Sequence, residues 1–210
     1  MVRHLSRHEQ HLVFLMMTTV VLQFSRCAPL TLKERWQQKA WVDYSLWICR
    51  LTHSPFSHVD YVLEDGNLLG ASDNPHAPVV AGNASGVAIR PPDYQRFSVR
   101  RNVTIHTTNK RATRFYDFVM AQLGKPFDAE ALKPSVFLSS QFHNRDWRTT
   151  ESWFCAELIG RATEVAPLLD WTIPGIKNRI TPADLILLLA PLYDYDKAAE
   201  RLPNVEAPEE

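Results

Sequence analysis

The feature that most constrains the fold is a pair of short apolar segments that flank Asp65-Gly66. Residues 58–63 and 68–71 have the length and composition of strands, and Asp-Gly between two strands is a strong signal of a two-residue β-hairpin turn. Residues 86–90 and 103–107 also read as strands. Because predicted helices lie on both sides of these segments, we expect an α+β fold built on antiparallel strands.

Four segments have features of helices. Residues 31–41 have helix-forming composition, and residues 109–123 carry an apolar stripe that ends before Gly124. Residues 150–165 form a further predicted helix, with Thr150 as its N-cap. Thr181-Pro182 opens another helix, because it places an N-cap threonine before a proline in the first turn. Residues 44–50 are predicted to be a strand.

The N-terminal segment contains an uncharged run, residues 12–24, that follows several basic residues. The run is shorter than the about 20 residues that span a bilayer, and it has the length of a signal-peptide core. Ser25-Arg26-Cys27 places an arginine where signal cleavage needs small residues, which slightly favours a cytoplasmic location over export. A buried or amphipathic helix, able to associate with a membrane, is the alternative. We expect residues 1–30 to be a leader or N-terminal helix, residues 31–195 the domain, and residues 196–210 a polar tail.

Composition excludes several classes of protein. Lys plus Arg and Asp plus Glu number 23 each, so the zero net charge argues against a nucleic-acid binder that acts through bulk charge. Six Trp, ten Phe and six Tyr demand burial and exclude a disordered chain. Three irregularly spaced cysteines form neither a disulfide framework nor a Cys-x-x-Cys zinc site.

Cys155 is the cysteine most suited to chemistry. It lies near the start of the helix predicted at residues 150–165, where the helix dipole favours the thiolate, the nucleophilic form. The alternative role is that of a small buried side chain among aromatic neighbours. Cys49 lies in an apolar run and is expected in the core, and Cys27 has no predicted role.

His58 is the candidate general base for Cys155, because it opens a predicted strand and would project from a rigid edge. A two-residue turn at Asp65-Gly66 would make paired residue numbers add to 131 and bring Asp73 opposite His58. A slip of one residue would bring Ser72 or Asn74 there instead. Asp60 shares a strand face with His58 and is a further candidate to orient the imidazole.

Several short motifs occur in one order along residues 44–190. They are Ser57-His58-Val59-Asp60-Tyr61-Val62, Asp65-Gly66, Gly70-Ala71, Gly86-Val87, Arg90-Pro91 with Tyr94, Gly124-Lys125-Pro126-Phe127-Asp128 and Trp153-Phe154-Cys155-Ala156-Glu157-Leu158. This order resembles the circularly permuted papain-like amidases, the YaeF/YiiX group of the NlpC-type superfamily. Lecithin retinol acyltransferase is a distant relative of that group. In the permuted enzymes the histidine strand precedes the cysteine helix, as His58 precedes Cys155.

The resemblance implies a fold in which an antiparallel sheet packs against a cysteine-bearing helix. It also implies a cysteine hydrolase of amide bonds, with Cys155 as nucleophile, His58 as base, and neither metal nor organic cofactor. The family's third polar residue falls at about Gly70, which has no side chain. His58 would then be oriented by Asp73, Ser72, Asp60 or a backbone carbonyl. Alternatively, Cys155 and His58 would act as a dyad without a third residue.

The resemblance leaves the substrate open among cell-wall peptides, other amides and lipids. Two alternatives to the amidase are a lipid acyltransferase or thioesterase of the same fold and a catalytically degenerate binding module. The glycine at position 70 is the feature that favours the binding module.

Overall fold

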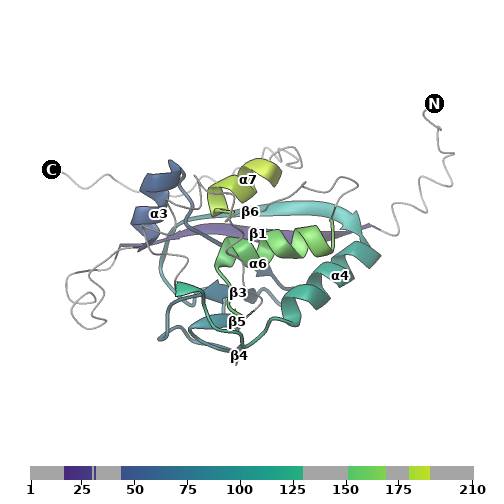
Figure 1. Ribbon diagram of the computed structural model, residues 1–210, viewed down its shortest axis with the longest axis horizontal. Helices are drawn as coiled ribbons and strands as arrows, with labels where there is room; N and C mark the ends of the chain where they lie inside the picture. Colours follow the sequence, from purple (N-terminus) through teal and green to yellow (C-terminus); the bar gives the residue numbers. More distant parts are fainter. Residues whose placement is uncertain (1–16, 30, 32–43, 130–150, 169–179, 190–210) are drawn as a thin grey trace, which may run out of the picture.

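A six-stranded antiparallel sheet of order β4-β5-β3-β2-β1-β6 forms the centre of the protein (Figure 1). The computed structural model describes residues 17–29, 31, 44–129, 151–168 and 180–189. The expectation of an α+β protein with an antiparallel sheet is confirmed. The strands are β1 (Met17–Cys27), β2 (His58–Val62), β3 (Leu68–Ser72), β4 (Ala81–Gly82), β5 (Gly86–Arg90) and β6 (Phe97–Thr108).

Strand β1 is the largest departure from the expected organisation, because it lies inside the sheet between β2 and β6. The expected helix is therefore wrong for Met17–Cys27, and residues 12–16 lie outside the described part. Val20, Leu22 and Phe24 alternate toward the core and are completely buried. These side chains pack within the hydrophobic core of the protein. The uncharged run that resembles a signal core is therefore, over residues 17–24, part of a strand with alternate residues in the core.

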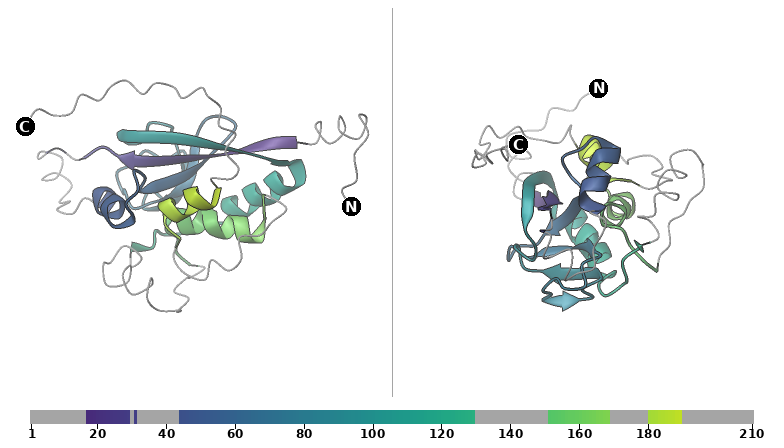
Figure 2. Two further views of the ribbon diagram at one scale, coloured as in Figure 1. Left: turned by 90° about the horizontal axis from the view of Figure 1, so that it is seen from above. Right: turned by 90° about the vertical axis from the view of Figure 1, so that its left-hand side faces the viewer.

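Four helices are described: α3 (Tyr44–Thr52), α4 (Asn109–Met120), α6 (Cys155–Val165) and α7 (Pro182–Leu189). Helices α4, α6 and α7 lie together on one side of the sheet (Figure 2). Helix α6 packs on β2 and β3, α4 packs on β1, and α7 packs on α6. None of the helices in these described ranges is long and apolar enough to cross a bilayer.

One observed helix replaces an expected strand, and the others differ from the expected helices mainly at their ends. Residues 44–50 form part of helix α3 and not the expected strand, with the consecutive residues Ile48 and Cys49 buried on one side of it. Helix α4 ends at Met120 rather than at residue 123, and its N-cap is Thr108. The α7 start is confirmed, because Asp184 N–H donates to Thr181 Oγ1 at 3.1 Å. The expected helix over residues 31–41 and the expected tail over 196–210 fall outside the described part, except for Thr31.

The β2–β3 hairpin closes with three loop residues and not with two. Leu63 N–H donates to Asn67 O at 2.8 Å, and Gly66 N–H donates to Leu63 O at 2.9 Å. Gly66 has a φ of 82°, a left-handed conformation that glycine adopts without strain. Paired residue numbers consequently add to 130, as in Tyr61 with Leu69 and Val62 with Leu68. The predicted register with Asp73 opposite His58 is therefore wrong by one residue.

Candidate active site

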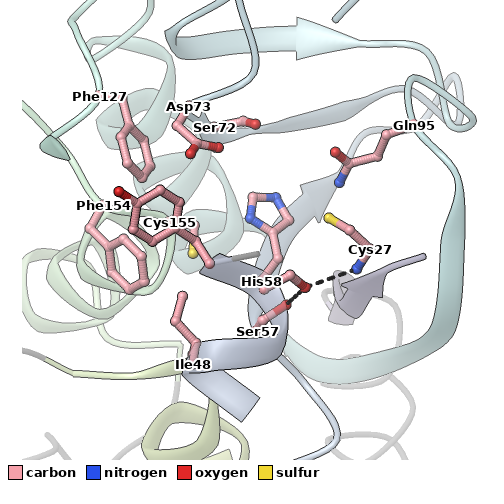
Figure 3. A pocket seen from close by; sticks show the side chains of 12 residues that line it. Cys27, Ile48, Ser57, His58, Ser72, Asp73, Gln95, Phe127, Phe154 and Cys155 are labelled. Carbon is pink, nitrogen blue, oxygen red and sulfur yellow. Dashed lines mark hydrogen bonds between the residues drawn. The ribbon is translucent and has the colours of Figure 1, made fainter. Parts of the chain in front are cut away.

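A cavity of about 60 Å³ lies where the first residue of β2 meets the first residue of α6 (Figure 3). Side chains from β1, α3, β2, β3 and α6 converge on it, together with residues of the intervening loops. Its described lining consists of Cys27, Tyr44, Ser45, Ile48, Ser57, His58, Ser72, Asp73, Gln95, Phe127, Phe154 and Cys155. The two residues expected to act together, His58 and Cys155, therefore share one cavity.

Cys155 is the first residue of helix α6. The expected helix start at Thr150 is wrong for residues 151–154, because Trp153 forms a β-bridge with Phe127 and Phe154 has extended backbone angles. The first hydrogen bond of the helix runs from Leu158 N–H to Phe154 O at 3.0 Å. The N–H groups of Cys155 and Ala156 consequently have no partner within the helix and point from its positive end.

His58 is held at the start of β2 by a short network beneath it. Ser57 N–H donates to Ser25 O at 3.0 Å, and the Ser57 and Ser45 hydroxyls lie 2.5 Å apart. The imidazole Nε2 of His58 lies 2.9 Å from Asp60 Oδ2. Donation from Nε2–H to this carboxylate leaves Nδ1 as the nitrogen that can accept the proton of Cys155.

The charges around His58 favour its protonated form. Burial lowers the pKa of His58, but the neighbouring Asp60 and Cys155 raise it through electrostatic interaction and side-chain hydrogen bonds. The pKa of His58 therefore lies well above its usual 6.5. An imidazole of this kind can stand as an imidazolium beside a thiolate.

Tyr94 completes the surroundings of the imidazole and the carboxylate. Its hydroxyl lies 3.1 Å from His58 Nε2 and 3.4 Å from Asp60 Oδ2, and it accepts a hydrogen bond from Gln95 Nε2 at 3.1 Å. Burial, followed by the negative charge of Asp60, raises the pKa of Tyr94 well above 10.0. The hydroxyl therefore keeps its proton and can donate it in a hydrogen bond to Asp60.

Arg90 binds several backbone carbonyl groups next to Tyr94. Its completely buried guanidinium donates from Nη1 to Gly70 O at 2.8 Å, and from Nη2 to Gly86 O at 2.8 Å and Ala84 O at 3.0 Å. It also lies 5.3 Å from the centre of the Tyr94 ring. The Arg90 guanidinium thereby holds β3, β5 and the loop before β5 together next to Tyr94.

The structure brings one of the three proposed orienting residues to the histidine. Asp60, completely buried on the same strand face, is the residue that binds His58. Ser72 and Asp73 line the cavity, but neither is hydrogen-bonded to His58 within the described residues. Gly70 is confirmed in the sheet beside them.

Several residues at the site were missed from the sequence. Tyr94 and Arg90 belonged to a quoted motif, but no sequence pattern assigned a contact to either. Gln95 had no signal at all, and Cys27 lines the cavity although no role was predicted for it. Of the other histidines, His106 is exposed on β6, and His143 lies outside the described residues. Cys49 is buried, as expected.

No protein-family model matches the chain, and no curated protein matches it significantly. Within the part of the chain that the structure describes, no group of three or more His, Cys, Asp or Glu side chains could hold a metal ion.

Proposed function

We propose that this protein is a cysteine hydrolase of amide bonds with the arrangement of a permuted papain-like enzyme. The observation that carries the proposal is the chain of contacts from Asp60 through His58 to Cys155. The strand that bears the histidine precedes the helix that bears the cysteine, and both begin at one cavity. Asp60 serves as the third member of the triad, because it holds the imidazole in the tautomer that a general base needs.

The mechanism follows from these positions. His58 Nδ1 takes the proton of the Cys155 thiol, and the thiolate sulfur attacks the substrate carbonyl carbon. The N–H groups at the start of α6 stabilise the negative oxygen of the tetrahedral intermediate. The imidazolium then protonates the leaving amine as the carbon–nitrogen bond breaks. Water, deprotonated by His58, cleaves the thioester and restores the thiol.

The walls of the cavity differ in chemistry, and this bears on the substrate. Ile48, Phe127 and Phe154 give it an apolar side next to Cys155, whereas Gln95 lies across the cavity on the other side of His58 (Figure 3). An apolar group on the acyl side of the scissile bond fits this division. The same apolar wall favours the second candidate function, transfer or hydrolysis of a lipid acyl group.

The test is the rate of iodoacetamide alkylation of Cys155 against pH, followed on the Cys155 peptide by mass spectrometry. A free thiol with a pKa of about 8.5 reacts slowly at neutral pH. We expect wild type to react rapidly at neutral pH, and His58→Ala to react at the slow rate of a free thiol. His106→Ala, which changes an exposed histidine on β6, should behave as wild type. Slow alkylation in all three proteins would contradict the proposal and favour a binding module.

Substrate classes can then be separated with Cys155→Ala as the inactive control. Peptide amides and acyl thioesters are incubated with both proteins, and the acyl-enzyme is sought on Cys155 by mass spectrometry. An adduct from a peptide amide supports the amidase, whereas an adduct from acyl thioesters alone supports the lipid reaction. An adduct with neither class, despite rapid alkylation, would contradict both hydrolytic functions for these substrates.

A further inference from the structure

The carboxylate of Asp60 lies over a glycine on the neighbouring strand. Tyr61 pairs with Leu69 and Val62 with Leu68, so the same register continued by one residue puts Asp60 opposite Gly70. A Cβ atom built on Gly70 would lie 2.0 Å from Asp60 Oδ1 and 3.1 Å from its Cγ. The acid from β2 therefore fills the space that a side chain at position 70 of β3 would occupy.

Both Asp60 and Gly70 are enclosed by their surroundings. Asp60 is completely buried, and Gly70 pairs with Ala88 of β5 in the interior of the sheet. The carbonyl oxygen of Gly70 also accepts a hydrogen bond of 2.8 Å from Arg90. A methyl group at position 70 would consequently have to displace the carboxylate rather than the backbone.

Hydrogen bonds fix only one of the two carboxylate oxygens. Asp60 Oδ2 binds His58 and Tyr94, whereas Oδ1 is buried and has no hydrogen-bond partner among the described residues. A buried acceptor without a partner costs free energy, so its position needs another cause. The open space above Gly70 supplies that cause, because it lets Oδ1 lie there while Oδ2 faces the imidazole.

We propose that Gly70 is a positioning residue, and that residues 60 and 70 are mutually exclusive sources of one acid beside His58. In this chain β2 supplies the acid and β3 leaves the space for it. An acidic side chain at position 70 would start at the place where Asp60 Oδ1 now lies, provided that residue 60 were small. The inference rests on the proposed function only in treating His58 as the base.

The first test measures the pKa of the His58 imidazole by NMR titration, which needs no substrate. Gly70→Ala should lower the pKa of His58 by about one to three units, as should Asp60→Ala, because each removes the carboxylate from Nε2. Thr104→Ala, which changes an exposed residue of β6 outside the cavity, should leave the pKa unchanged. An unchanged His58 pKa in folded Gly70→Ala would overturn the proposal.

The second test moves the acid from one strand to the other. The double variant Asp60→Ala/Gly70→Asp should recover a raised His58 pKa, whereas Asp60→Ala/Gly70→Ala should not. Equal pKa values in the two double variants would overturn the exchange. These titrations do not depend on hydrolysis, so a failure of Cys155 to react would count against the proposed function and leave this inference standing.

Stability measurements cover the case in which Gly70→Ala does not fold. The added methyl group should destabilise the wild-type background strongly but the Asp60→Ala background little, because the second background lacks the carboxylate that collides with it. Equal destabilisation in both backgrounds would show that Asp60 is not what excludes a side chain at position 70.

Discussion

His58 and Asp60 lie two residues apart on the same strand, and Nε2 of the histidine is 2.9 Å from Oδ2 of the acid. Side chains two residues apart on a strand point to the same face, so the local backbone alone brings them together. The position of Asp60 beside His58 is therefore set within β2 and does not depend on the register between strands. The Tyr94 hydroxyl lies within 3.4 Å of both His58 Nε2 and Asp60 Oδ2.

Asp60→Asn should slow the alkylation of Cys155 at neutral pH by about tenfold or more, since one unit of pKa corresponds to a factor of ten. The amide has no charge to raise the pKa of His58, so the imidazole is neutral over more of the pH range. Asp117→Asn is the matched control, because Asp117 is an exposed acid of α4 that does not line the cavity. Equal rates in the two variants would refute the role of Asp60.

The contribution of His58 to stability should fall as the pH rises. Its pKa in the folded protein lies well above 6.5, so the folded state binds the proton more tightly than the unfolded state does. The stabilisation is complete below about pH 6.5, decreases above it and disappears once the pH exceeds the folded-state pKa. Urea denaturation of wild type and His58→Gln across this range should show a difference in unfolding free energy that shrinks with increasing pH. A difference that grows with pH would contradict the raised pKa.

Local patterns predicted the parts of the site that depend on a single element. His58 at the head of a strand, Asp60 on its face and Cys155 near a helix start follow from strand alternation and helix-end electrostatics. The position of Asp73 required the loop length, and the left-handed Gly66 adds one loop residue that the dipeptide pattern does not reveal. A register error of one residue moves a side chain to the other face of a strand.

The fold was hardest to predict where apolar runs are short. Residues 17–27 and 44–52 are both rich in apolar side chains, yet the first is a strand and the second a helix. Periodicity alone does not separate a buried strand from a buried helix at such lengths. Pairing with β2 and β6 decides the outcome for β1, and this pairing is tertiary. Tyr94 and Arg90 escaped prediction for the same reason, because their partners lie on other segments.

Tyr94→Phe should lower the rate of Cys155 alkylation at neutral pH by about fivefold and leave the fold intact. The substitution removes one hydroxyl, and a hydrogen bond of this kind contributes about 1 kcal/mol. The change should take the form of a shifted pH profile, because the hydroxyl acts on Asp60 and His58 rather than on the substrate. Tyr116→Phe, at a partly exposed tyrosine of α4, is the control. Identical pH profiles for the two variants would count against a positioning role for Tyr94.

Arg90→Lys should destabilise the protein by about 3 kcal/mol, as removing a partner from a buried charged network does. A lysine ammonium lacks the planar fork with which Arg90 reaches the carbonyls of Gly70, Ala84 and Gly86 together. Arg100→Lys should change the unfolding free energy by at most about 0.5 kcal/mol, because the Arg100–Asp93 ion pair is exposed. Urea denaturation of both variants measures the contrast. Since Arg90 binds the carbonyl of Gly70 and packs on Tyr94, the pKa of His58 should also fall in Arg90→Lys. Equal stability of Arg90→Lys and Arg100→Lys would show that the buried guanidinium does not hold these segments together.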